Sequence, residues 1–223
     1  MRVSIKTAIV AAVTAIALVP GVAQAQSYNH IDAAGDMFDL SGVPLPTVTN
    51  GDIVGLSVNY TKKSLTLVTT LTAIDTSGTN GLSWVADVSS KKRHYTIGVA
   101  ADASGVEKIY RQGHSKKKCR KMTATVDPVA MTMTAVVPSN CVNSKKNIQI
   151  MLMGISTDGT VAPDGTPNLA LDDAFLTGGD LTTFGISPVI KRGGTGVVLD
   201  PLRTVKHTNP AAKHLVQVAL RHF

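Results

Sequence analysis

An almost unbroken alternation of apolar and polar residues between positions 52 and 155 is the feature that most constrains this chain. Leu56, Val58 and Tyr60 alternate with polar or small neighbours, and later segments repeat the same period of two. Successive side chains of a strand point to opposite faces of a sheet, so this period predicts strands with one buried face. Turn signals such as Asp127-Pro128 divide the stretch into about seven strands, a spacing typical of an antiparallel sandwich.

The acidic residues and the threonines support the same fold class. Of the fifteen acidic residues only Glu107 is a glutamate, whereas 25 residues are threonine. Glutamate favours helices, threonine favours strands and aspartate favours turns, so this balance indicates a β protein. Charged residues make up only 17% of the chain and hydrophobic residues 43%, which excludes a disordered chain dominated by charge. We therefore predict an all-β fold, an antiparallel and jelly-roll-like β-sandwich over residues 52–192.

The segments around this strand pattern are expected to be irregular. Residues 26–51 are rich in turn formers and constitute a predicted N-terminal arm. Residues 156–180 hold five aspartates but no lysine or arginine, so we expect a long acidic loop there, followed by a strand-like stretch over 181–190. The tail over 193–223 is basic. Asn209-Pro210 would start a short helix in this tail, although the run HLVQVAL fits a strand equally well.

The first 25 residues have the three parts of a secretory signal peptide. Arg2 and Lys6 give a basic start, an apolar run covers 7–19, and Ala23-Gln24-Ala25 offers a cleavage site of small residues. The apolar run is short for a membrane span, and no second long apolar stretch follows it. We therefore expect a secreted protein, extracellular or associated with the cell wall, without stable membrane insertion after cleavage. An uncleaved membrane anchor is the alternative.

The chain has two cysteines, Cys119 and Cys141. An even number of cysteines in an exported chain indicates a disulfide, which here would close a loop of about 20 residues. A catalytic or zinc-binding pair is the alternative. Zinc would need two more ligands, and His114 is the histidine near this pair in sequence.

Several short motifs occur in an order that resembles a known group of proteins. Ala34-Gly35-Asp36 precedes Gly51-Asp52-Ile53-Val54, and Val136-Val137-Pro138-Ser139-Asn140-Cys141 precedes Asp172-Asp173-Ala174. In this order the chain resembles small secreted actinobacterial proteins whose β-sandwich is similar to DOMON domains and family 9 carbohydrate-binding modules. The resemblance implies the sandwich fold and a disulfide between the two cysteines. It implies no activity, and the Met and His pair of haem-binding DOMON domains has no clear counterpart here.

Positive charge is concentrated in one part of the chain. Residues 91–121 hold ten basic residues against Asp102 and Glu107, a net charge of +8 in a chain whose total is +7. If the strands of this region are neighbours, the basic residues meet on one rim and would attract an anionic polymer, such as teichoic acid or a sulfated or uronic polysaccharide, or anionic lipid head groups. Lysine-rich loops that only keep a β protein soluble are the alternative. The predicted ligand-binding residues are Lys91, Lys92, Arg93, Lys108, Arg111, Lys116, Lys117, Lys118, Arg120 and Lys121.

Aromatic residues bear on two other classes of ligand. Nucleic acid gains little support, because basic and aromatic residues interleave only at His94-Tyr95 and Tyr110-Arg111. A glycan surface usually presents exposed aromatic rings, and this chain offers few of them. Three aromatic residues alternate with core positions and are predicted to be buried, namely Trp84, Tyr60 and Tyr95. The rings expected to be freer are Tyr28, Phe38 and Tyr110.

Two groups of aspartates offer the hard oxygen ligands that calcium prefers. The first group is Asp32, Asp36 and Asp39, which are the candidate metal ligands, and the second is Asp158, Asp164 and Asn168. Neither group has the spacing of an EF-hand loop. Asp-Gly pairs are also ordinary turn formers, so a purely structural role is the alternative to calcium as a cofactor.

Hydrolase motifs are weakly represented. The chain has no G-x-S-x-G elbow and no H-E-x-x-H helix, and Asp172 and Asp173 would point to opposite faces of a strand. We therefore predict a non-catalytic binding domain for an anionic polymer or glycan. The alternatives are a structural or accessory domain whose partner is another protein, and a secreted hydrolase with an unrecognised site.

Overall fold

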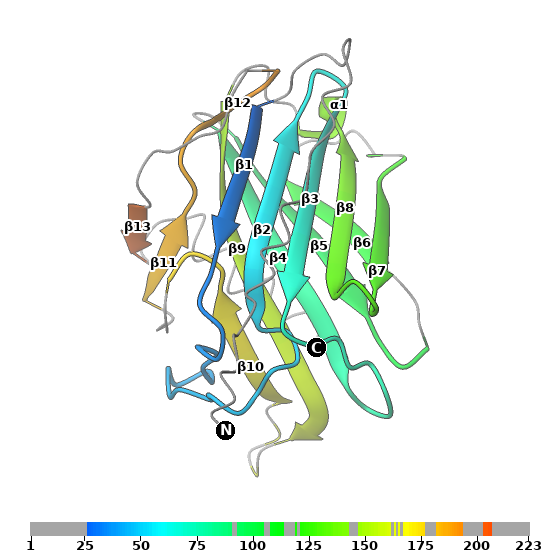
Figure 1. Cartoon of the computed structure of the whole chain (residues 1–223), viewed down its shortest axis with the longest axis vertical. Coiled ribbons are helices and arrows are strands. Elements are labelled where there is room, and N and C mark those ends of the chain that lie inside the picture. The colour runs from blue at the N-terminus through cyan, green and yellow to red at the C-terminus, as the bar shows by residue number, and fades with distance from the viewer. Residues whose placement is uncertain are drawn as a thin grey trace, which may run out of the picture.

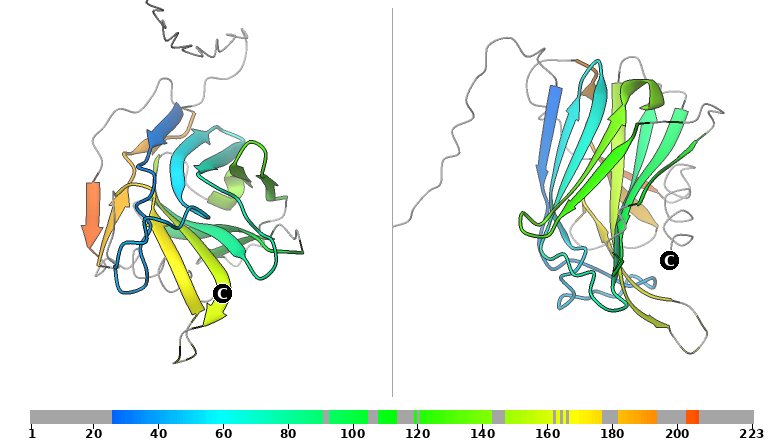
Figure 2. Two further views of the ribbon diagram at one scale, coloured as in Figure 1. Left: turned by 60° about the horizontal axis from the view of Figure 1, so that its bottom comes forward. Right: turned by 90° about the vertical axis from the view of Figure 1, so that its right-hand side faces the viewer.

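The computed structural model describes residues 26–90, 93–104, 108–113, 119, 121–142, 147–161, 163, 165, 167–176, 182–193 and 203–206. Over these residues the protein consists almost entirely of antiparallel strands in two sheets that pack against each other (Figures 1 and 2). The prediction of an all-β sandwich is therefore confirmed.

The first sheet has the strand order β1-β2-β3-β8-β7. Two of its four neighbouring pairs are hairpins, β7–β8 and the predicted β2–β3 hairpin that turns at Lys62-Lys63. The strands are β1 (Gln26–Ile31), β2 (Ile53–Tyr60), β3 (Ser64–Leu71), β7 (Thr123–Asp127) and β8 (Thr132–Pro138).

The second sheet has the order β10-β9-β4-β5-β6, and the short strand β12 pairs with the start of β9. Its strands are β4 (Gly81–Ser90), β5 (Arg93–Ala101), β6 (Lys108–Gly113), β9 (Asn147–Val161), β10 (Pro167–Asp173) and β12 (Ile190–Lys191). The remaining elements are the paired strands β11 (Thr183–Ile186) and β13 (Arg203–Lys206), and the short helix α1 (Ser139–Val142) that follows β8.

The main core lies between the two sheets. Trp84 and Tyr60 are fully buried and Tyr95 is nearly so, which confirms the prediction for these three rings. Tyr28 and Phe38 were expected to be freer, and this prediction is wrong: only 4% and 1% of their surfaces are exposed. Tyr28 is buried because residues 26–31 form a strand of the sandwich, and Phe38 because its backbone pairs with β10. The structure describes the backbone of Tyr110 but not its side chain.

A second apolar cluster lies on the other side of the second sheet. Val85, Met151 and Met153 pack there with Phe184 and Ile186 from β11. Strands β4 and β9 are therefore buried on both faces along most of their length. Continuous burial explains why the apolar run at 150–153 departs from strict alternation.

Two predictions about irregular segments need correction. The N-terminal arm begins only at residue 32, because residues 26–31 pair with β2 over their whole length as β1. The acidic loop expected over 156–180 is largely a hairpin, because β9 continues to Val161 and β10 returns from Pro167. Ser156 and Thr157 of β9 and the residues Leu169–Asp173 of β10 are paired in this hairpin, and the register shifts between Pro167 and Leu169. The strand-like stretch over 181–190 is divided into β11 and the start of β12.

Cys119 and Cys141 form a disulfide, as predicted. The bond joins the residue that precedes β7 by a few positions to helix α1. A cross-link of two residues 22 positions apart stabilises the fold by roughly 3 kcal/mol when its effect on the unfolded chain is considered.

Several predictions concern residues outside the described part of the chain. These are the signal peptide over 1–25 and the helix or strand expected near the C-terminus. Within the described residues, no helix has the length and apolar character needed to cross a membrane.

Candidate functional site

Five aspartates gather at one end of the sandwich, where the chain leaves β1 and where β10 ends. We call this group the acidic end; it consists of Asp32, Asp36, Asp52, Asp172 and Asp173. The first three lie in the connection between β1 and β2, and the last two close β10. In Figure 1 this connection is the blue trace that runs below β1 and passes beside β10.

Glycines allow this connection to approach the second sheet closely. Gly154 of β9 lies opposite Asp172, and a Cβ atom at Gly154 would lie 2.4 Å from the carbonyl oxygen of Gly51. Gly51 itself has a φ of +86°, which favours glycine. The close approach brings the backbone N–H of Ile53 to Oδ2 of Asp172, to which it donates a hydrogen bond of 2.6 Å.

Asp52 holds the connection together from within. Its Oδ2 accepts hydrogen bonds from the backbone N–H of Gly35 at 3.0 Å and from the hydroxyl of Thr72 at 2.6 Å. Asp52 is fully buried, and its backbone carbonyl also accepts the N–H of Thr72. One carboxylate therefore joins the loop after β1 to the end of β3.

Carboxylate oxygens of Asp32, Asp36 and Asp172 all lie within 4.8 Å of one another. Asp172 is fully buried, whereas the other two are half-buried. Three oxygens of the acidic end are buried and have no hydrogen-bond partner, namely Oδ2 of Asp32, Oδ1 of Asp52 and Oδ1 of Asp172. Buried polar atoms in proteins are nearly always hydrogen-bonded, so these three oxygens need an explanation.

Three carboxyl groups of the acidic end have a raised pKa. The pKa of Asp172 is raised to about 9, chiefly by burial and also by the nearby Asp32 and Asp36, despite the opposing hydrogen bond from Ile53. Burial raises the pKa of Asp32 to about 8, with Asp36 as the second cause. Burial also raises the pKa of Asp173 to about 7, against hydrogen bonds from the N–H groups of Gly185 and Phe175.

The structure brings together two of the three aspartates predicted to bind a metal. Asp39 does not join Asp32 and Asp36; its Oδ1 accepts the N–H groups of Ser41 at 2.7 Å and Val43 at 2.9 Å and so forms a turn. In the second predicted group, Oδ1 of Asp158 accepts the N–H of Thr160, and the amide of Asn168 donates to the hydroxyl of Thr160. Asp164 lies outside the described residues.

The sequence reasoning missed Asp172 as a member of the metal group. A signal was present, because two adjacent aspartates are unusual in a strand whose other residues are mostly apolar. Asp172 and Asp173 lie in strand β10, as the sequence argument that they point to opposite faces of a strand assumed. Both residues are buried.

Four of the ten basic residues predicted as a binding site have a described backbone position, and these positions lie on or beside β5, β6 and β7. We call this part of the sandwich the basic edge. Its described members are Arg93 on β5, Lys108 and Arg111 on β6, and Lys121 shortly before β7. In the β5–β6 pairing Lys108 lies opposite Ala100, and Arg111 lies opposite Ile97. Strand β6 is the last of its sheet, β7 is the last of the other, and the two are in contact (Figure 1). The other six predicted residues, Lys91, Lys92, Lys116, Lys117, Lys118 and Arg120, lie outside the described residues.

His94 adds a titratable group beside Arg93. Its Nδ1 lies 3.3 Å from Oδ2 of the fully buried Asp87 on β4, and this hydrogen bond raises the pKa of His94. A histidine–aspartate pair is also found in hydrolases. Here, however, the hydroxyl of Ser89, the cross-strand neighbour of His94, donates to the carbonyl of Gln149, so it is not aligned as a nucleophile.

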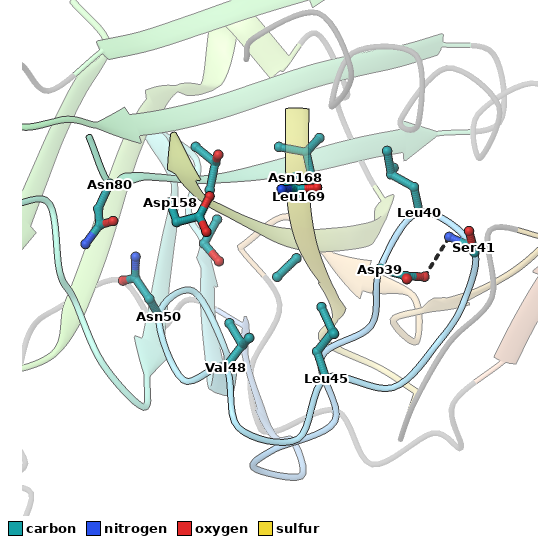
Figure 3. A pocket seen from close by; sticks show the side chains of 13 residues that line it. Asp39, Leu40, Ser41, Leu45, Val48, Asn50, Asn80, Asp158, Asn168 and Leu169 are labelled. Atoms are coloured by element: carbon teal, nitrogen blue, oxygen red, sulfur yellow. Dashed lines mark hydrogen bonds between the residues drawn. The ribbon is translucent and has the colours of Figure 1, made fainter. Parts of the chain in front are cut away.

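A pocket of about 570 Å³ lies between the connection after β1 and the β9–β10 hairpin (Figure 3). Its lining includes polar groups that are already used within the protein. The amide of Asn50 exchanges two hydrogen bonds with the backbone of Asp75, and the amide of Asn80 donates to the Asp75 carboxylate. Among the described residues, no aromatic side chain lines the pocket. The pocket walls are therefore built largely from residues that hold turns.

Comparison with protein-family models, with curated proteins and with solved structures finds no match for this chain. The resemblance to DOMON domains and family 9 carbohydrate-binding modules therefore stays a prediction.

Proposed function

We propose that this protein is a non-catalytic binding domain that holds an anionic polymer along the basic edge. The observation that supports the proposal is the adjacency of β5, β6 and β7, which brings the backbone positions of Arg93, Lys108 and Arg111 near the strand that Lys121 precedes. Neighbouring strands lie about 4.8 Å apart, so cations on adjacent strands are spaced closely enough to meet successive charges of a polymer.

The physical basis of such binding is electrostatic. A row of like charges at a surface raises the local concentration of polyanions, and each contact releases counterions from the polymer. The described basic residues lie on β5, on β6 and before β7, whereas the acidic end lies at β10 and the β1–β2 connection, and β10 and β6 are at opposite ends of the second sheet. The two charge groups therefore do not neutralise each other, which supports attraction of an anionic ligand to the edge.

A neutral glycan in the pocket is less well supported. Sugar rings usually stack on exposed aromatic side chains, which the pocket lining lacks, and several of the lining amides are already hydrogen-bonded within the protein. A protein partner would favour a continuous apolar surface. The large exposed apolar residues that the structure describes instead lie in separate parts of the chain, such as Ile31 in β1, Val129 in the turn between β7 and β8, and Val161 at the end of β9.

The polymer is proposed to lie outside the cytoplasm, either in the cell envelope or beyond it. This part of the proposal rests on the predicted signal peptide and on the disulfide, since disulfides persist in oxidising compartments. Nucleic acid is disfavoured because few aromatic residues accompany the cations.

A salt series tests the proposal. We would measure binding of the protein to a sulfated polysaccharide and to poly(glycerol phosphate), and compare it with the double variant Lys108→Ala/Arg111→Ala. A matched control, Lys62→Ala/Lys63→Ala, removes two exposed lysines from the β2–β3 turn. We expect affinity to fall linearly on a log–log plot against salt, with a shallower slope for the β6 variant alone. Equal slopes for the wild type and both variants would contradict the proposal.

A further inference from the structure

The acidic end contains more buried carboxylate oxygen than its own hydrogen bonds satisfy. Oδ2 of Asp172 accepts the Ile53 N–H, whereas Oδ1 of the same fully buried group has no partner. Asp52 repeats this arrangement: Oδ2 accepts two hydrogen bonds and the buried Oδ1 accepts none. In each carboxylate, one oxygen accepts a hydrogen bond from the backbone and the other oxygen has no hydrogen-bond partner.

These unused oxygens come from parts of the chain that are far apart in sequence. Asp32 follows β1, Asp52 precedes β2, and Asp172 belongs to β10, yet the three repel one another electrostatically across the acidic end. Folding brings them together against this repulsion. A protein can relieve such a cluster by protonation or by binding a cation. A proton supplies one donor to one oxygen, whereas a cation contacts several oxygens at once.

We propose that the acidic end is a Ca²⁺ site in which Asp32, Asp36 and Asp172 supply carboxylate ligands and Asp52 lies beside them to hold the loop. The donor set consists of oxygen atoms, which suits a hard cation rather than zinc. Ca²⁺ binds oxygens at about 2.3–2.6 Å, so ligands on opposite sides of the ion lie up to about 5 Å apart. The three carboxylate oxygens lie within 4.8 Å of one another, which is compatible with this spacing of ligands around Ca²⁺. Mg²⁺, with distances of about 2.1 Å, requires a tighter arrangement.

Ca²⁺ at this position would fasten the connection after β1 to the second sheet. Two residues beyond Asp36, Phe38 exchanges two backbone hydrogen bonds of 2.8 Å with Leu171, the neighbour of Asp172. The chain then forms the pocket wall over residues 39–50, which Figure 3 shows facing the β9–β10 hairpin. The ion would therefore order one wall of the pocket. This inference does not depend on the proposed polymer binding at the basic edge.

The test uses the full secreted chain, stripped of metal with EDTA and then titrated with CaCl₂ or MgCl₂. Isothermal calorimetry gives the dissociation constant, and thermal unfolding gives the shift in Tm. We expect Ca²⁺ to bind with one equivalent and to raise Tm, and Mg²⁺ to bind at least tenfold more weakly. Asp36→Asn, a half-buried position that should tolerate the change, should weaken Ca²⁺ at least tenfold. Asp39→Asn, in the neighbouring turn, should bind Ca²⁺ like the wild type.

The variant Asp172→Asn should differ from the wild type in Tm in one direction without Ca²⁺ and in the other direction with Ca²⁺. An asparagine keeps an oxygen for the Ile53 N–H but removes the buried charge. In EDTA we therefore expect this variant to melt at the same temperature as the wild type or higher, whereas in Ca²⁺ it should melt lower. A wild type whose Tm and calorimetric heat do not respond to millimolar Ca²⁺ would overturn the proposal. An equal response of the wild type, Asp36→Asn and Asp172→Asn would overturn it as well, because binding would then lie elsewhere.

Discussion

The acidic end and the basic edge place like charges in opposite environments. At the acidic end, carboxylates with half-buried or fully buried side chains share a region in which burial opposes their ionisation. At the basic edge, Lys108 and Arg111 lie on β6, the outermost strand of its sheet, and Lys121, which is exposed to solvent, precedes β7, the outermost strand of the other sheet. Buried like charges demand a counter-charge within the fold, whereas surface like charges are screened by water and remain available to a ligand. The comparison separates the proposed Ca²⁺ site from the proposed polymer-binding surface.

The disulfide should have the largest effect on the stability of the fold, while leaving Ca²⁺ binding at the acidic end in place. The double variant Cys119→Ser/Cys141→Ser should lose roughly 3 kcal/mol of unfolding free energy, because the unfolded chain regains the freedom that the cross-link removes. Urea denaturation measures the loss. At a temperature where the variant is folded, its Tm should still rise with Ca²⁺. A variant that no longer responds to Ca²⁺ would show that the two regions are coupled.

Gly154→Ala should damage the acidic end. The added Cβ would lie 2.4 Å from the Gly51 carbonyl oxygen and 3.1 Å from Cδ1 of Ile53, so the loop that carries Asp52 must move away from β9. Overpacking of this kind destabilises a fold by about 1–3 kcal/mol. Gly55→Ala in β2 is the matched control, since its Cβ meets nothing closer than 3.5 Å. Equal stability of the two variants in urea would refute the close packing described here.

Salt should distinguish the two regions. Raising the NaCl concentration from 50 to 200 mM should weaken binding of an anionic polymer by a factor of about ten or more, because several surface contacts release counterions. The Ca²⁺-dependent rise in Tm should change far less, since pairs that are buried are screened little. Affinity measurements and thermal unfolding in the same buffers make the comparison. A polymer affinity that is insensitive to salt would argue against the basic edge.

His94 should give the smallest effect. Its pKa is raised in the folded protein by the hydrogen bond to Asp87, so the charged form stabilises the fold. This contribution is fully present below the unfolded pKa near 6.5 and is lost as the pH rises through the folded pKa. The free energy of unfolding of the wild type should therefore exceed that of His94→Gln, and this difference should be larger at pH 5.5 than at pH 8.5. A difference that grows with pH would contradict the assigned pair.

The fold class could be predicted from the sequence because alternation is a local property. Leu56, Val58 and Tyr60 each point inward for a reason that their immediate neighbours reveal. The same local reasoning failed at 156–180, where turn-forming residues lie inside a hairpin. It failed again for Phe38, whose burial depends on pairing with a strand more than 130 residues later.

The candidate sites show the same limit. Asp32 and Asp36 are close in sequence and were predicted together, whereas Asp172 joins them only because β10 pairs with β9. The pair of His94 and Asp87 likewise depends on the register of β4 against β5, in which Asp87 lies opposite Thr96. The basic edge was predictable in composition, but the contact of β6 with β7 required the arrangement of two sheets.

Hydrogen exchange in the presence and absence of a sulfated polysaccharide would show whether the polymer binds at the basic edge. The measurement uses the wild-type protein at low salt and reports which backbone segments the polymer protects. If the basic edge binds the polymer, protection should appear in peptides that cover β5, β6 and the start of β7, and should vanish in Lys108→Ala/Arg111→Ala. Protection confined to the pocket wall over 39–50 and the β9–β10 hairpin, or its absence from β6, would contradict the account.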